Sequence, residues 1–514
     1  MSCFLGIDAG TSGIKAVIVD EKGKVLGFGL AECEVFTPRP SWAEANPEDW
    51  WTACCQAVKM AVSKSGKGKE VKGIGFSGQM QGCTLMDKDM KSINNCLIWL
   101  DQRAASIADS LNSRVDDEIL NITSNYCKPS FWAPKLLWIK KHNPKDFEKI
   151  KTVLFPKDYL RYRITGEVAT DVSDASLSWF LDAKKRTWSD RMFEFTGLSR
   201  SLVPERVLES CDIAGYLKKD IAEDWGLTAG IPVATGGGDQ TAGGVGCGIL
   251  KSGTIATTLG TSGVVFGACD TPFIDSQNNG MFSQCHCVPG KYSFLGCTLA
   301  AGGSMKWLRD TFFKDKMEEL KIKGGNIYEY IDSLAREQPI GTEGLVFLPY
   351  MSGSGTPHTD GDARGVFFGL SYRNNLGSFS RAIMEGVTYS LRDTVEIIRE
   401  SNGIKVDKVI AMGGGSNSQL WRQMQADIYN ATVVTTSIVE GPAAGAAIMG
   451  AVASKYFNNV EEACSSWVHP IESIDPIQEN VKIYNEYYQT YKDLYPALEK
   501  LYASQAEKVR NIVK

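Results

Sequence analysis

Asp8 ends an apolar run and stands next to a glycine-rich turn. The run Phe4–Ile7 has the composition of a buried strand, and Gly10-Thr11-Ser12-Gly13 follows one residue after Asp8. A carboxylate at the end of a strand is suited to a hydrated Mg²⁺, and the N–H groups and hydroxyls of such a turn are suited to phosphate. The alternative is an aspartate that only closes its own turn.

A second carboxylate, Asp239, directly follows the glycines Gly236–Gly238. These glycines come after the strand-like run Ile231–Thr235, and they let the backbone approach a ligand closely at the start of a helix. A carboxylate in this position is suited to act as a general base that takes a proton from a hydroxyl group. The competing interpretation is a helix N-cap.

Two other patterns suggest chemistry but lack the context that each requires. The segment Gly73–Gly78 matches the G-x-G-x-x-G fingerprint of dinucleotide-binding oxidoreductases, but no helix pattern begins within it. Cys285-His286-Cys287 would place its cysteines and its histidine on opposite faces of a strand, which disfavours a zinc site. The sequence has no G-x-x-x-x-G-K-[ST] motif either, so a P-loop is not expected.

Short strands and helices alternate along the chain, and they would position both carboxylates. Phe4–Ile7, Ile14–Val19 and Val25–Leu30 are separated by turn residues and form a predicted meander. A helix over Glu48–Ser63 and a strand over Val71–Phe76 follow. This alternation predicts an α/β architecture.

The tetrapeptide Gly-Thr-Ser-Gly occurs a second time, at 260–263, directly after the strand-like run Thr254–Leu259. Two similar halves are the inference, divided near Leu250 into residues 1–249 and 250–514. Chance recurrence of four common residues is the alternative. The order of strand, glycine loop and helix occurs again late in the chain, with a predicted strand over 407–412, three glycines and a predicted helix over 419–429.

Composition limits the classes of partner. The chain has 514 residues with 55 Lys and Arg against 60 Asp and Glu, and its one basic segment, Lys64–Lys72, is interrupted by glycines and expected to be a solvated loop. Nucleic acid and membrane surfaces are therefore not expected partners. No apolar run reaches the length of a membrane span, and the fourteen scattered cysteines suit a reducing compartment, so a cytoplasmic location is expected. The charged, aromatic segment Tyr484–Lys514 is expected to be a helix that serves packing and an oligomer surface, such as that of a homodimer.

In order along the chain, these features resemble the FGGY family of carbohydrate kinases. The resemblance implies two actin-like (ribonuclease H-like) ATPase domains flanking a cleft. It is carried by Gly6–Gly13, Ser77–Gly82, Trp99–Arg103, Ala133–Trp138, Pro156–Leu160, Thr170–Ala175, Gly237–Asp239, Leu259–Val264, Phe347–Tyr350, Gly365–Leu370, Gly413–Gly415 and Trp421–Met424.

The resemblance implies a role for each matching residue. Asp239 is implied as the proton acceptor for the sugar hydroxyl, and Asp8, together with Asp239, as a group that places Mg²⁺ and phosphate. The implied sugar contacts are Met80, Gln81, Asp239, Gln240, Asp101 and Trp42. The implied ATP contacts are Gly10, Thr11, Ser12, Lys15, Gly260, Thr261, Ser262, Gly303, Gly414, Gly415, Ser416 and Asn417.

The finer resemblance within the family is to kinases that phosphorylate D-xylulose at O5, with ATP and Mg²⁺. The chain departs from the residues usual there at Gln81, which replaces a histidine, and at Gln240 and Leu100, which each replace an asparagine. In Ser352–Pro357, Ser354 and Gly355 stand where a charged Glu-Arg pair is usual. Unlike histidine, glutamine carries no positive charge at any pH. Another pentulose or small polyol (ribulose, L-xylulose or glycerol) is therefore the alternative substrate, and an actin-like ATPase or sugar sensor without transfer activity is a further hypothesis.

Overall fold

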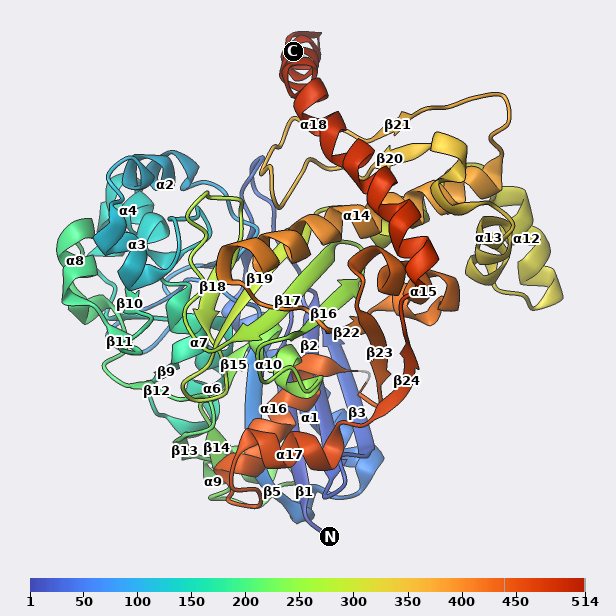
Figure 1. Cartoon of the computed structure of the whole chain (residues 1–514). Helices are drawn as coiled ribbons and strands as arrows, with labels where there is room; N and C mark the ends of the chain where they lie inside the picture. Colours follow the sequence, from blue (N-terminus) through green and yellow to red (C-terminus); the bar gives the residue numbers. More distant parts are fainter. Residues whose placement is uncertain (439, 513–514) are drawn as a thin grey trace.

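Two seven-stranded sheets form the framework of the computed structural model, which describes residues 1–438 and 440–512 (Figure 1). The first sheet has the strand order β13-β14-β5-β1-β2-β3, with β15 paired to β5 beyond β14. Its strands are β1 (Cys3–Ala9), β2 (Gly13–Asp20), β3 (Val25–Glu32), β5 (Val71–Gly78), β13 (Ile213–Tyr216), β14 (Pro232–Ala234) and β15 (Gly237–Gly238).

The second sheet has the order β18-β19-β17-β16-β22-β23-β24. Its strands are β16 (Thr254–Leu259), β17 (Gly263–Cys269), β18 (Phe282–Cys285), β19 (Tyr292–Thr298), β22 (Lys408–Met412), β23 (Thr432–Thr436) and β24 (Pro470–Ile474). Short pairs outside the two sheets are formed by β4 (Glu44–Ala45) with β7 (Cys96–Leu97), β6 (Thr84–Met86) with β8 (Thr152–Leu154), β9 (Thr170–Asp171) with β12 (Val207–Leu208), β10 (Leu181–Asp182) with β11 (Thr187–Trp188) and β20 (Val346–Leu348) with β21 (Val366–Phe368).

Both sheets repeat one arrangement. β1 and β2 are antiparallel across the first Gly-Thr-Ser-Gly turn, and β5 runs parallel to β1. In the second sheet β16 and β17 are antiparallel across the second such turn, and β22 runs parallel to β16. The predicted α/β class and the repetition are thereby confirmed, whereas the division at 249/250 stays a prediction.

The helices complete the α/β layers. They are α1 (Pro47–Ser65), α2 (Ala105–Asn112), α3 (Asp117–Thr123), α4 (Trp132–His142), α5 (Pro144–Phe147), α6 (Pro156–Thr165), α7 (Val172–Ser176), α8 (Asp190–Thr196), α9 (Lys219–Trp225), α10 (Asp239–Gly246), α11 (Gly302–Phe312), α12 (Lys314–Lys323), α13 (Ile327–Arg336), α14 (Leu376–Asn402), α15 (Gln419–Tyr429), α16 (Gly441–Ala453), α17 (Val460–Trp467) and α18 (Gln478–Ile512). Short 3₁₀ turns span Gly68–Glu70, Arg200–Leu202, Ile340–Gly344 and Gly414–Asn417. The predicted glycine loop at 413–415 therefore continues into a 3₁₀ turn.

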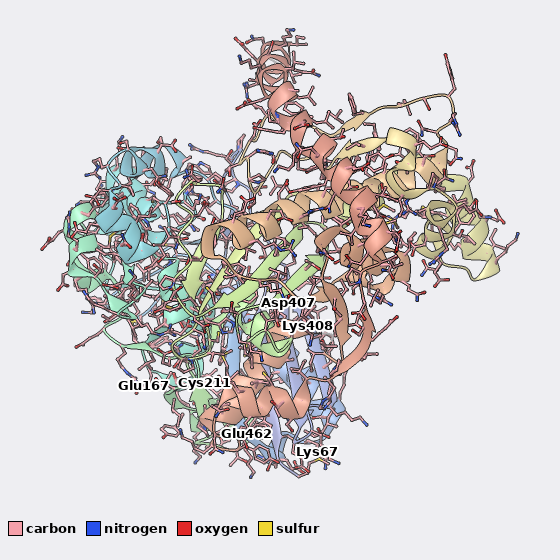
Figure 2. The ribbon with its side chains drawn as sticks, viewed as in Figure 1. Lys67, Glu167, Cys211, Asp407, Lys408 and Glu462 are labelled. Carbon is pink, nitrogen blue, oxygen red and sulfur yellow. The ribbon has the colours of Figure 1, made fainter. Side chains whose placement is uncertain are left out.

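Helix α16 belongs to the late part of the chain but packs on β1 and β5 of the first sheet. Glycines make this close approach possible: a Cβ on Gly6 or Gly75 would overlap the carbonyl oxygens of Ala443 and Ala446. Side chains of Phe4, Val17 and Val19 share a core cluster with α16 and α17. In Figure 2, Glu462 of α17 and Lys67 lie toward the end of the molecule that carries the N-terminus, and Asp407 and Lys408 lie near the centre, where β22 begins.

The C-terminal helix α18 crosses α14 and projects beyond the rest of the chain (Figure 1). This confirms a helix for the predicted tail. The fourteen cysteines are free thiols, most of them buried. Within residues 1–438 and 440–512, none of the helices combines the length and the apolar character needed to span a membrane.

Candidate active site

Asp8 lies near the end of β1 and is held by the neighbouring strand. The Ser77 hydroxyl on β5 donates to Asp8 Oδ1 at 2.9 Å, and the carboxylate is 7% exposed. Lys15 pairs with Asp8 across β1 and β2, and its Nζ lies 2.6 Å from Glu440 Oε2. Burial raises the pKa of Asp8 to about 6, while the Ser77 hydrogen bond and the Lys15 charge act in the opposite direction.

Asp239 is the first residue of α10, beside Asp8. The two-residue strand β15 pairs Gly237 with Ser77, which brings the start of α10 to the same end of the sheet as Asp8. Burial raises the pKa of Asp239 to about 7, the negative charge of Asp8 adds to the rise, and hydrogen bonds from Gln240 act against it. Near neutral pH a large fraction of this carboxylate is ionised and able to accept a proton.

The glycines before Asp239 are required by close packing. Gly236 has a φ of +85°, a conformation that other residues rarely adopt. A Cβ on Gly238 would lie 2.7 Å from Met80 Cγ. The Met80 side chain therefore packs directly against the backbone that presents Asp239.

The predicted sugar residues Met80 and Gln81 lie in the turn after β5. Gln81 is 5% exposed and has a φ of +68°. Its carbonyl oxygen accepts from Lys135 Nζ at 2.9 Å, and the same ammonium group donates to the carbonyls of Leu97 and Ile98. A buried lysine thus fixes an otherwise unfavourable turn. Gln240 follows Asp239 in α10 and is partly exposed.

Gln79 is a residue of this turn that sequence reasoning did not place in the site. It is 1% exposed, its backbone N–H donates to the Ala9 carbonyl at 2.8 Å, and among the described residues neither atom of its side-chain amide has a hydrogen-bond partner. The only sequence signal was its place between Ser77 and Met80. In the structure, its buried amide, without a partner in the described part of the chain, is able to hydrogen-bond to a ligand.

Asp101 and Trp42, two further predicted sugar contacts, lie beside Arg103. Asp101 is fully buried, and its carboxylate accepts from Ala43 N at 2.8 Å and from the Arg103 guanidinium at 2.7 to 2.9 Å. The Arg103 guanidinium stacks 3.7 Å from the Trp42 ring centre. Trp42, Arg103 and Trp138 line a cavity of about 870 Å³ whose described lining includes neither Asp8 nor Asp239. This geometry supports a structural role for Asp101, and its contact with sugar stays a prediction.

The first predicted phosphate loop, Gly10-Thr11-Ser12, lies between β1 and β2. Trp99 Nε1 donates to Thr11 Oγ1 at 2.9 Å, which orients this hydroxyl. The second loop, Gly260-Thr261-Ser262, lies between β16 and β17, and its carbonyl oxygens accept from the N–H groups that begin α11: Gly302 donates to Gly260 at 2.8 Å and Gly303 to Thr261 at 3.0 Å.

A cavity of about 460 Å³ joins the second loop to the 3₁₀ turn after β22. Six predicted ATP residues line it: Gly260, Thr261, Gly303, Gly414, Gly415 and Asn417. Ser262 and Ser416 belong to the same loops, but the lining described for this cavity does not contain them. Sequence reasoning missed the contribution of the 326–332 segment, which supplies Asn326, Tyr328, Glu329 and Asp332. No motif marks that segment, since only tertiary packing brings it to the cavity.

Comparison with known proteins adds to this geometry. The model of the FGGY family of carbohydrate kinases, N-terminal domain, matches residues 3–246, and that of the C-terminal domain matches residues 255–454. The chain belongs to the FGGY family of carbohydrate kinases. It is therefore a carbohydrate kinase, and a sugar and ATP are its substrates.

Family relatives match the chain over most of its length. A xylulose kinase from Bacillus subtilis is 35% identical, with 96% of this chain and 97% of the relative covered. One from Escherichia coli is 38% identical, with 88% and 90% covered. The solved structure of a xyloylose kinase from Brucella ovis has a TM-score of 0.88 and 33% identity, with 97% of this chain and 100% of that chain covered.

Proposed function

We propose that this FGGY kinase transfers the γ-phosphoryl group of ATP to O5 of D-xylulose. The observation that carries the proposal is a pair of carboxylates at one end of the first sheet, Asp8 buried and Asp239 partly buried, with the pKa of Asp239 raised to about 7. Relatives described as xylulose kinases support the choice of sugar.

In the proposed reaction, Asp239 accepts the proton of the attacking hydroxyl. The hydroxyl oxygen forms a bond to the γ-phosphorus, the bond between that phosphorus and the β,γ-bridging oxygen breaks, and ADP leaves. Met80 and Gln81 would hold the sugar beside Asp239 and Gln240. The phosphates would be oriented by the second loop and by Gly10, Thr11, Ser12 and Lys15. The adenosine would lie in the cavity between α13 and the Gly414–Asn417 turn.

The donor set fits a hydrated Mg²⁺. Among residues 1–438 and 440–512, no three His, Cys, Asp or Glu side chains are grouped as metal ligands, but Mg²⁺ typically uses one or two carboxylates together with waters and phosphate oxygens. Asp8, with Asp239 nearby, would provide them. The ion would neutralise charge on the β- and γ-phosphates.

The alternative substrate is another pentulose or a small polyol. Gln81 and Gln240 are the reason to test this alternative. Their amides replace an ionisable ring and a shorter amide, so they change the polar groups that face the sugar. A cytoplasmic location and a homodimer remain proposals as well, based on the composition and on the exposed α18.

A coupled assay of ADP release tests the proposal. The purified chain is supplied with ATP and Mg²⁺ and, separately, with D-xylulose, D-ribulose, L-ribulose, L-xylulose, glycerol or no sugar. We expect the highest kcat/KM with D-xylulose. A higher kcat/KM with another acceptor would overturn the choice of sugar, and sugar-independent or absent turnover would overturn transfer itself.

A further inference from the structure

A fully buried ionic cluster lies behind the glycines that precede Asp239. Lys157 Nζ, at the start of α6, lies 2.7 Å from Asp158, 2.9 Å from Asp171 and 3.1 Å from Asp174. Arg161 Nη1 contacts Asp158 at 2.7 Å and donates to the Thr235 carbonyl at 2.7 Å. All five charged side chains have no exposed surface. Buried charges are expensive, so a cluster of this size calls for a reason beyond stability.

Asp171 is the member of the cluster that faces the active-site loop. Burial acts to raise its pKa, but the Lys157 charge and the hydrogen bonds from Ser173 outweigh burial and lower it. As an ionised carboxylate, Asp171 only accepts hydrogen bonds. Its Oδ2 accepts from Ser173 N at 2.8 Å, from Ser173 Oγ at 2.5 Å and from Ser210 Oγ at 2.9 Å.

These contacts fix the direction of the Ser173 hydroxyl. Its single proton is donated to Asp171, so its oxygen is left as an acceptor. That oxygen accepts the backbone N–H of Gly238 at 3.0 Å. Gly238 is the residue immediately before Asp239, and Asp174 Oδ1 lies only 3.1 Å from where a Cβ on Gly238 would be.

We propose that Ser173 is a positioning residue for catalysis: oriented by the buried Lys157–Asp171 pair, it anchors the Gly238 N–H and thereby fixes the Asp239 carboxylate against the sugar hydroxyl. The inference rests on the proposed role of Asp239. Each carboxylate therefore has a serine of its own. Ser77 on β5 donates directly to Asp8, whereas Ser173 acts on Asp239 through the Gly238 backbone.

Ser173→Ala and Ser210→Ala form a matched pair. Each removes one buried hydroxyl from the same Asp171 oxygen, but only Ser173 contacts Gly238. We expect Ser173→Ala to lower kcat by about 10- to 100-fold, since small displacements of a catalytic group have effects of this size. KM for ATP should change less than threefold. Ser210→Ala should keep kcat within about threefold, with a fall in melting temperature similar to that of Ser173→Ala.

Ser173→Thr, which keeps the hydroxyl, should recover most of kcat. Equal kcat losses in the two alanine variants, or no loss in Ser173→Ala, would overturn the inference. Asp239→Asn is measured alongside. If that variant keeps normal turnover, the proposed base is wrong; if it is inactive while Ser173→Ala behaves like Ser210→Ala, the base stands and only the anchoring role fails.

Discussion

Asp239 combines a partly buried environment with a negative neighbour, and both favour its protonated form. A base with a pKa near the working pH exchanges protons readily, so the environment that opposes ionisation also suits the carboxylate to catalysis. The same environment makes the ionised residue unfavourable for folding. Active sites commonly lose stability in this way where activity requires it.

Asp239→Asn separates these two effects. We expect kcat to fall at least ~100-fold because the base is lost, while binding of a non-hydrolysable ATP analogue to the cavity beside α13 is unchanged. Since the folded-state pKa lies above the unfolded value of about 3.9, stability is lost as pH rises between them. The variant should therefore melt at a higher temperature than the parent at pH 8. Near-normal turnover would contradict the assignment.

The pH dependence of kcat/KM should reflect the raised pKa values of Asp239 and Asp8. We expect an acid limb that begins near pH 7, where Asp239 takes up a proton, and that steepens below about pH 6, where Asp8 does so as well. Asp393→Asn is the control, because burial also raises the pKa of Asp393 to about 7 but this residue lies in α14, bonded to Tyr488. An acid limb that disappears in Asp393→Asn, or a flat profile from pH 8 to 5, would contradict the prediction.

Elements with strong local signals were predictable. Thr254–Leu259 and Gln419–Tyr429 form β16 and α15 with the predicted bounds, because β-branched residues and an apolar helical face agree with the tertiary structure. The glycines beside strand ends were enough to single out Asp8 and Asp239 one by one, whereas their joint role was implied by the family resemblance. The anchoring by Ser173 and the lining from α13 depend on contacts between distant segments, which spacing does not encode.

The contact between α16 and the first sheet gives an element-scale prediction. A Cβ on Gly75 would overlap the Ala446 carbonyl oxygen, so Gly75→Ala must displace either α16 or β5. We expect it to lower the free energy of unfolding by about 1–3 kcal/mol, measured by urea denaturation. Gly361→Ala is the control, since no atom lies within 4 Å of a Cβ there, and its effect should stay within about 0.5 kcal/mol. Equal effects would show that this contact is not tight.

At the scale of the whole molecule, the repeated sheets can be predicted from the sequence, whereas the packing of α16 on the first sheet cannot. Repetition of the Gly-Thr-Ser-Gly turn is visible in the sequence, and the strand order around both turns is the same. Return of the chain to the first sheet through α16 is not visible in the sequence, because Gly441–Ala453 is apolar and mostly small along its whole length, and nothing in it points to one sheet over the other.

This return means that residues 1–249 do not contain all of their own hydrophobic core, since Phe4, Val17 and Val19 pack with α16 and α17. Produced separately, fragments 1–249 and 250–514 should each be poorly folded and bind a dye for exposed apolar surface. Produced together, they should associate without a peptide bond and recover kinase activity. A protease cut at Leu250 would then leave a working nicked enzyme, whereas independent folding of fragment 1–249 would contradict this view.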